Sequence, residues 1–315
     1  MRNIAAASAG LAVSWPGPGP DAMVAEPASL SDKPKSDLMP RILSSLVLAP
    51  LAIIVAWLPS SSYPEAGAWA FGLFWLIAAI AVWWEWTTLV SGRASGNRLL
   101  FFLGSSALLL AMVVAEFSTA RTRTPMLIIA LGALAAGVFA RAERRIWVAA
   151  GLLYAGALFA APILLRRDAE VGLLAILFLF ALVWATDIAG YFAGRAFGGP
   201  KLAPGISPNK TWSGAIGGAI GGMLAGSAIV ALAGVGNIPV IALVAFALSA
   251  VAQAGDLFES AIKRRFGAKD AGHLIPGHGG VMDRLDGFIA AAAAAMAIGI
   301  VRADMDTAAQ GLLLW

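Results

Sequence analysis

The chain has 315 residues, of which 60% are hydrophobic and 13% are charged, and it carries a formal net charge of +4 with no cysteine. A soluble domain of this size could not bury so much apolar surface, so the composition excludes a soluble protein and predicts a polytopic membrane protein. A sequence without cysteine also excludes disulfides, a thiolate nucleophile and a cysteine metal site. The basic residues stand in short loops, which suits membrane topology and anionic substrates rather than nucleic acid.

Residues 1–37 are rich in Ala, Pro, Gly and Ser, and the run Pro-Gly-Pro-Gly-Pro extends from Pro16 to Pro20. Such a composition cannot bury enough apolar surface to fold, so we predict a disordered N-terminal tail. A cleaved signal peptide and a start at a later methionine are the alternatives. We expect N-terminal transmembrane helices in 38–170 and a C-terminal transmembrane catalytic region in 171–315.

Apolar runs of roughly 20 residues, each long enough to cross a bilayer as a helix, recur along the rest of the chain. They predict an all-α fold, a polytopic transmembrane helical bundle of about nine spans. The predicted spans are 42–58, 67–90, 99–116, 126–140, 146–165, 171–194, 213–235, 239–257 and 284–301. The fourth is short, and the eighth is expected to continue into water as a polar helix to about Arg265.

Lysines and arginines are concentrated in the loops on one side of this bundle. By the positive-inside rule, that side is the cytoplasmic one. This orientation places the two most polar loops, 195–212 and 258–283, at the cytoplasmic face, where a substrate from the cytosol could reach both.

The seventh span carries a ladder of small residues, Gly214, Gly218, Gly222 and Gly226. Two helix backbones approach closely where side chains are missing, so tight helix packing is the favoured interpretation. Dimerisation and the shaping of a lipid groove are the alternatives.

Asp256, Ser260 and Lys263 follow one another at i, i+4 and i+7, so on a helix they share one face. A carboxylate, a hydroxyl and an ammonium group stacked in this way could hold a metal ion and a phosphate, and Arg264 adds fixed positive charge. A positive anchor at a helix end would explain the basic residues. It would not explain Asp256, because an aspartate at membrane depth costs about 2.5–3.5 kcal/mol.

A second polar cluster opens the last span and consists of His278, Gly279, Gly280, Asp283, Arg284 and Asp286. Asp256 and Asp283 stand at opposite ends of one loop, so their carboxylates can converge. Two hard oxygen ligands with room for water and phosphate suit Mg²⁺, and the number of cations stays open. We expect His278 to contact substrate, whereas His273 is more typical of a solvated loop residue.

The loop 195–212 contains Ser207, Asn209, Lys210 and Thr211 and runs directly into the glycine-rich seventh span. Backbone N–H groups at a helix start bind anions, so the loop is similar to a phosphate cradle. It lacks the spacing of a Walker A motif. An ordinary basic cytoplasmic loop is the alternative.

Two further acids lie within predicted spans. Asp187, in the sixth span, either pairs with a cytoplasmic lysine or belongs to the polar site. Glu85 stands among Trp83, Trp84 and Trp86 near the end of the second span. We interpret these tryptophans as an interfacial aromatic belt and Glu85 as an interfacial residue.

The run SAIKRRFGAKDAGHLIPGHGGVMDRLD, from Ser260 to Asp286, resembles the signature of the phosphatidate cytidylyltransferases, also called CDP-diacylglycerol synthases. The residues matching its fixed positions are Ser260, Lys263, Arg264, Lys269, Asp270, His278, Gly279, Gly280, Asp283, Arg284 and Asp286. The segments Asp187–Gly194 and 207–211 and the run Gly-Asp-Leu-Phe-Glu-Ser from Gly255 are also similar. The chain departs from the family at Ser213, where an acid is frequent, and at Gly287, where a serine is frequent.

The resemblance implies that phosphatidic acid and CTP are converted to CDP-diacylglycerol and pyrophosphate with Mg²⁺, in phospholipid biosynthesis. It implies a homodimer in a bacterial-type inner membrane, with the active site facing the cytoplasm. We expect Asp256 and Asp283 to be metal ligands. The expected catalytic residues are Lys263, Arg264, His278, Arg284 and Asp286. The expected substrate-binding residues are Asp187, Ser207, Asn209, Lys210, Thr211, Ser260, Lys269, Gly279 and Gly280.

Two other functions are compatible with some of these features. A CTP-dependent lipid kinase of the dolichol or phytol type has similar polar segments and is the nearer alternative. A transporter would spread its polar residues along several spans near the midplane, whereas here they gather in two loops.

Overall fold

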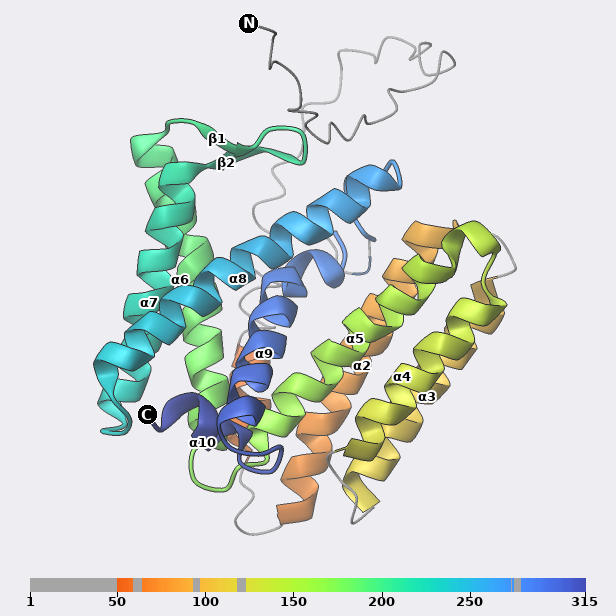
Figure 1. Ribbon diagram of the computed structural model, residues 1–315, viewed down its shortest axis with the longest axis horizontal. Coiled ribbons are helices and arrows are strands. Elements are labelled where there is room, and N and C mark those ends of the chain that lie inside the picture. Colours follow the sequence, from red (N-terminus) through yellow and green to blue (C-terminus); the bar gives the residue numbers. More distant parts are fainter. Residues whose placement is uncertain (1–49, 59–63, 93–96, 118–122, 273, 275–278) are drawn as a thin grey trace, which may run out of the picture. The chain divides into compact units, whose positions relative to one another are not determined.

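A computed structural model describes residues 50–58, 64–92, 97–117, 123–272, 274 and 279–315 (Figure 1). The predicted disordered tail, 1–37, lies outside the described residues. His273, His278 and residues 42–49 of the first predicted span also lie outside the described residues. The described residues 50–57 of that span are helical.

The long helices follow one another with short connections. They are α2 (Pro64–Ser91), α3 (Asn97–Phe117), α4 (Arg123–Phe139), α5 (Arg145–Arg166), α6 (Gly172–Phe197), α7 (Trp212–Leu232), α8 (Ile238–Arg265) and α9 (Met282–Arg302). In the described parts, seven helices are long and apolar enough to cross a membrane, and α4 is a shorter apolar one. These helices confirm the second to ninth predicted spans, including the short fourth. The protein is therefore an all-α, polytopic helical bundle.

Three short elements were not predicted. A 3₁₀ turn, η2 (Ala142–Arg144), precedes α5, and α10 (Ala308–Leu313) follows α9. An antiparallel hairpin of β1 (Lys201–Ala203) and β2 (Ser207–Thr211) joins α6 to α7. Much of the polar loop 195–212 is thus an ordered hairpin at the end of two helices (Figure 1).

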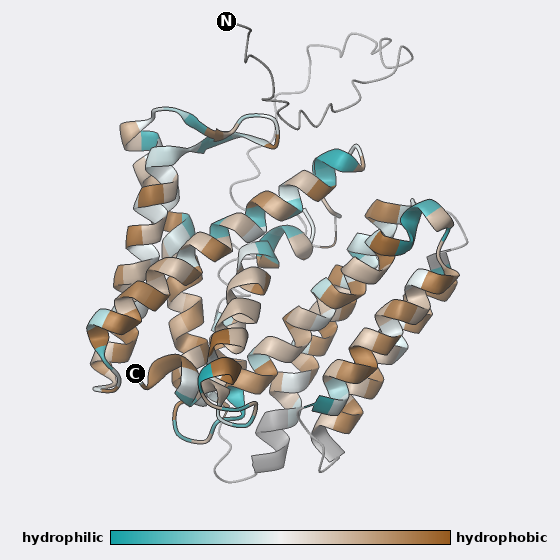
Figure 2. Cartoon of the chain, viewed as in Figure 1, coloured by the Kyte–Doolittle hydropathy of each residue, from teal (hydrophilic) through white to brown (hydrophobic). Residues whose placement is uncertain are grey.

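The helices form two groups that α9 connects. In the first group α5 packs on α2 and α4, and α3 packs on α2 and α4. In the second, α7 packs on α6 and α8, and α8 packs on α9. Because α9 also packs against α2, α5 and α6, this helix is held from both groups. Figure 2 shows hydrophobic residues along the helix bodies and hydrophilic residues at the hairpin and at the C-terminal end of α8.

The glycine ladder of α7 packs inside the chain. A Cβ atom on Gly214 would lie 2.9 Å from the carbonyl oxygen of Gly190, and one on Gly218 would lie 2.8 Å from that of Thr186. Both neighbours are in α6. The prediction of tight helix packing is confirmed. The glycines of this ladder contact α6 of the same chain rather than a second copy.

The prediction that three tryptophans of α2 form an interfacial aromatic belt is wrong for two of them. Trp83 and Trp86 are fully buried, and only Trp84 is exposed. The indole of Trp83 donates to the carbonyl oxygen of Phe101 at 3.2 Å, and that of Trp86 donates to Trp147 at 2.8 Å. These tryptophans fasten α2 to α3 and α5. Glu85, between them, is 1% exposed and therefore is not an interfacial residue.

Candidate active site

Helices α8 and α9 cross where both have glycines. A Cβ atom on Gly255 would lie 2.9 Å from the carbonyl oxygen of Asp286, and one on Gly287 would lie 3.2 Å from that of Ala252. The backbones approach closely because these positions lack side chains. Asp256 and Asp286 each adjoin one of the two glycines, and the charge of Asp256 acts on Asp286, so both carboxylates lie near the crossing.

Asp187 of α6 joins this pair. The charge of Asp256 acts on both Asp187 and Asp286, and the charge of Asp187 acts on Asp286. Lys210 and Arg284 supply positive charge to Asp187, and Lys210 also supplies it to Asp286. Carboxylates from three helices thus share one neighbourhood with cationic groups, as the prediction that Asp187 belongs to the polar site requires.

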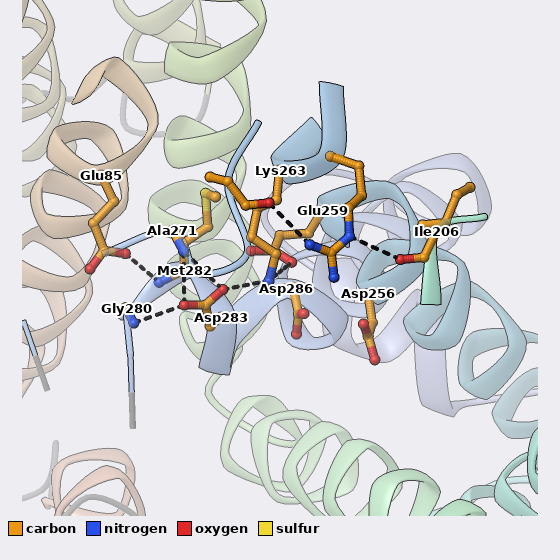
Figure 3. Close-up of polar contacts among 12 residues, drawn as sticks. Glu85, Ile206, Asp256, Glu259, Lys263, Ala271, Gly280, Met282, Asp283 and Asp286 are labelled. Carbon is orange, nitrogen blue, oxygen red and sulfur yellow. Dashed lines mark hydrogen bonds and ion pairs between the residues drawn. The ribbon is translucent and has the colours of Figure 1, made fainter. Parts of the chain in front are cut away.

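The hairpin delivers Lys210 to this neighbourhood. Its Nζ forms an ion pair with the Oδ2 of Asp256. The two side chains are 29% and 34% exposed, so the pair is reachable from outside the bundle. Farther along α8, the Nε of Arg264 donates to the carbonyl oxygen of Ile206 at 3.5 Å (Figure 3). The hairpin is therefore attached to α8 at two points.

A second polar network surrounds Lys263 of α8. Its Nζ lies 2.6 Å from the Oδ1 of Asp283 and 2.7 Å from the Oε2 of Glu259, which is fully buried (Figure 3). Asp283 also accepts backbone N–H bonds at its Oδ2, from Gly280 at 2.8 Å and Ala271 at 3.1 Å. The loop that joins α8 to α9, residues 266–281, is called the signature loop below. One carboxylate of α9 thus binds α8 and residues on both sides of the undescribed part of this loop.

The predicted metal pair therefore has two different settings. Asp256 pairs with Lys210, whereas Asp283 is occupied by Lys263 and two backbone amides. The carboxylate that the helix crossing places beside Asp256 is that of Asp286. Within the described residues, no group of three or more His, Asp or Glu side chains is arranged to hold a metal ion.

Some predicted substrate-binding residues have structural tasks. The hydroxyl of Thr211 accepts the N–H of Gly214 at 3.2 Å and so caps α7. Ser207 and Asn209 are part of β2 rather than of an irregular phosphate loop. Gly279 has a φ of +83°, a backbone conformation that favours glycine.

The remaining predicted residues lie around these networks. Ser260 is half-buried on α8, and Lys269 and Arg284 are exposed. At the two departures from the family, Ser213 donates to the carbonyl oxygen of Gly198, and Gly287 belongs to the helix crossing.

Three residues of the site were not assigned to it from the sequence. Glu259 completes the network of Lys263, and the buried hydroxyl of Tyr154 in α5 lies within electrostatic reach of Asp256, Glu259 and Asp286. Glu85 in α2 binds the start of α9. Each was detectable as a polar group within an apolar helix, a position that is costly unless it serves a purpose.

Comparison with known proteins identifies the family. The sequence model that describes the cytidylyltransferase family matches residues 39–301 of this chain. A phosphatidate cytidylyltransferase of Brucella suis biovar 1 (strain 1330) is 44% identical over 279 residues, which cover 86% of this chain and 96% of the relative. Proteins of the same name from Haemophilus influenzae and Bacillus subtilis (strain 168) are 43% and 38% identical over 40% and 44% of this chain, and over 45% and 51% of their own length. The chain belongs to the cytidylyltransferase family.

Proposed function

We propose that this integral membrane protein transfers the cytidylyl group of CTP to phosphatidic acid, forming CDP-diacylglycerol and pyrophosphate in phospholipid biosynthesis. The observation that carries the proposal is the similarity along 96% of a protein named phosphatidate cytidylyltransferase. The polar residues at one end of apolar helices support it, because the diacyl tails can stay in the bilayer while the headgroup meets a nucleotide.

In the proposed reaction, a phosphate oxygen of phosphatidic acid attacks the α-phosphorus of CTP. The bond from that phosphorus to the oxygen bridging the α- and β-phosphates breaks, and pyrophosphate leaves with this oxygen. The nucleophile is already an anion, so no general base is needed. The difficulty is the repulsion between two polyanions, which fixed positive charges reduce most in the transition state.

Four basic side chains support this part of the proposal. Lys210 comes from β2, Lys263 and Arg264 from the end of α8, and Arg284 from the start of α9. We assign the four to the phosphates of CTP and of the lipid. Ser207, Asn209, Ser260, Lys269, Gly279 and Gly280, together with His278 outside the described residues, are proposed as further substrate contacts.

The carboxylates fit a magnesium ion, because Mg²⁺ prefers a few hard oxygen ligands and retains water. We propose Asp256 and Asp286 as the residues that hold it, since the crossing of α8 and α9 joins them. Asp283, the ligand expected from the sequence, stays a further candidate. A bound Mg²⁺ would supply charge neutralisation at the phosphates.

The function is tested with purified protein, phosphatidic acid and CTP labelled on either the α- or the γ-phosphate. Cytidylyl transfer puts the α-label, and not the γ-label, into the lipid product. A lipid kinase, which the family match does not favour, would put only the γ-label into the lipid. That outcome, or an α-labelled product made equally well from the other nucleoside triphosphates, would refute the proposal.

We further propose that the site faces the cytoplasm in a bacterial-type inner membrane. The sequence has no cysteine, so a single cysteine can be introduced and labelled without background. Gly205→Cys in the exposed hairpin should react with a membrane-impermeant maleimide only after the membrane is opened. Asp306→Cys, beyond the other end of α9, should react in intact cells, and the reverse pattern would invert the orientation.

The expected homodimer is also a proposal, and it rests on the family resemblance. The glycine ladder lends it no support, since these glycines pack against α6 of the same chain. Light scattering of the protein in detergent, corrected for bound detergent, measures the mass directly, and a monomer would refute it.

A further inference from the structure

Glu85 is a buried acid in the apolar helix α2, far in sequence from the residues of the signature. Its side chain reaches the first residues of α9 (Figure 3). The Oε1 accepts the backbone N–H of Val281 at 2.9 Å, and the Oε2 accepts that of Met282 at 2.7 Å. Both carboxylate oxygens are therefore engaged by one short stretch of backbone.

These two amides need an acceptor. The first N–H groups of a helix have no partner within the helix, and a side chain commonly caps them. The N-cap residue of α9 is Val281, which makes no side-chain capping bond. Glu85 takes over this task from another helix, and its negative charge is favourable at the positive end of the helix dipole.

The signature loop leaves room for this carboxylate. A Cβ atom on Gly272 would lie 2.6 Å from the Oε1 of Glu85, and one on Gly280 would lie 2.6 Å from its Oε2. Neither glycine has a positive φ, so backbone conformation does not require glycine at these positions. Glycine is required there because the carboxylate of Glu85 occupies the space that a side chain would need. Residues before and after the undescribed part of the loop thus meet at one side chain.

The position of Glu85 is itself rigid. The neighbouring residues Trp83 and Trp86 are fully buried, and their indoles bond to α3 and α5. In α9, Met282 is followed directly by Asp283, which pairs with Lys263, and one turn later by Asp286. A shift of the first turn of α9 would displace both acids relative to α8.

We propose that Glu85 is a positioning residue of the active site. It holds the described residues Gly272 and Gly280 and the first turn of α9 so that Asp283 and Asp286 face α8, and it does not itself touch the substrates. The inference rests on the proposed cytidylyltransferase function and deepens it, because it assigns to the N-terminal helices a part in catalysis.

The decisive variant is Glu85→Gln. The carboxamide keeps the size of the side chain but has only one acceptor oxygen, so an NH₂ group would face one of the two backbone N–H groups. Thr87→Val is the matched control. Thr87 is equally buried on the same helix, and among the described residues its hydroxyl bonds to the carbonyl oxygens of Trp83 and Trp84, both within α2.

Three quantities are measured for each variant: the folded fraction in detergent, kcat and KM for both substrates, and hydrogen exchange of the peptide covering residues 279–286. For Glu85→Gln we expect kcat per folded molecule to fall about ten- to a hundredfold, as the loss of one hydrogen bond to a charged group would cause. KM should change far less, and exchange at the amides of Val281 and Met282 should become faster. Thr87→Val should leave kcat and exchange unchanged, and Glu85→Asp, which keeps both acceptors, should recover part of kcat.

A purely structural role gives a different result. Activity would then fall only in proportion to the folded fraction, with kcat per folded molecule unchanged, and this would overturn the proposal. If Glu85→Gln does not fold, Glu85→Asp and Gly272→Ala, which crowds the carboxylate from the opposite side, answer the same question. A wild-type protein without cytidylyl transfer would refute the proposed function, whereas the exchange measurement would still test the anchor itself.

Discussion

Replacing Lys263 with methionine removes a cation that lies between two buried acids. The Nζ lies 2.6 Å from Asp283 and 2.7 Å from Glu259. The side chains of Lys263, Glu259 and Asp283 are 12%, 0% and 9% exposed, so water cannot take over the role of the ammonium group. Methionine has a similar length, so the change removes charge and leaves little void.

The expected cost is large because a buried ion pair is broken from one side. Removing one partner of a buried pair destabilises a protein by about 3–5 kcal/mol, since the remaining charge is left without compensation. Asp283 keeps its two backbone N–H donors, which limits the loss there. Most of the penalty should therefore come from Glu259, because burial raises the pKa of its carboxyl to about 9, so without Lys263 it must either take up a proton or stay buried as an unpaired anion.

This origin of the penalty makes the double variant informative. Glu259→Gln in the Lys263→Met background replaces this buried acid by a neutral amide and should restore part of the lost free energy, with a coupling of about 0.5–3 kcal/mol. Equilibrium unfolding in detergent, followed by tryptophan fluorescence, measures the free energy of unfolding. Turnover should stay low in the double variant, because Lys263 is also assigned to a substrate phosphate. An unfolding free energy of Lys263→Met within about 0.5 kcal/mol of the wild type would refute this reasoning.

Three other substitutions probe the rest of the site. Gly255→Ala should lower kcat about tenfold or more, because the added methyl group forces α8 away from the carbonyl oxygen of Asp286. Gly205→Ala is the control, since its methyl group would point into open space and should leave kcat unchanged. Equal kcat values for the two variants would contradict the role of the helix crossing. Thr211→Ala should cost about 1 kcal/mol of stability through loss of the α7 cap, and Thr211→Ser should not; calorimetry in detergent distinguishes them. Asp286→Asn should raise the Mg²⁺ concentration for half-maximal activity about tenfold or more, and an unchanged Mg²⁺ titration would remove this residue from the proposed ion site.

The sequence predicts the helices well because bilayer thickness imposes a length on each apolar run. The end of α8 near Arg265 and the short helix α4 were both visible in this way. The hairpin between α6 and α7 was not, since Ser207–Thr211 has neither the length nor the alternation of a typical strand. Its order comes from tertiary contacts, among them the pairing of Lys210 with Asp256.

The site was predictable as a set of residues but not as a set of contacts. Asp256, Lys263 and Asp283 stand out from the sequence as charges beside apolar runs. Which acid lies next to Asp256 depends on where two helices cross, and that depends on Gly255 and Gly287. The sequence suggests the wrong setting for Glu85, because tryptophans beside an acid are typical of a membrane interface. Here Trp83 and Trp86 are buried against neighbouring helices instead.

The bond between Glu85 and the beginning of α9 bears on how the chain can be divided. A fragment starting at Gly172 would contain every residue of the signature and a complete α6–α9 bundle. In it, the amides of Val281 and Met282 would lack their acceptor, although nothing in the fragment's own sequence would reveal the deficit. Adding the first half back as a separate polypeptide should restore this acceptor, so the N-terminal helices contribute to the site and do not serve only to hold the protein in the membrane.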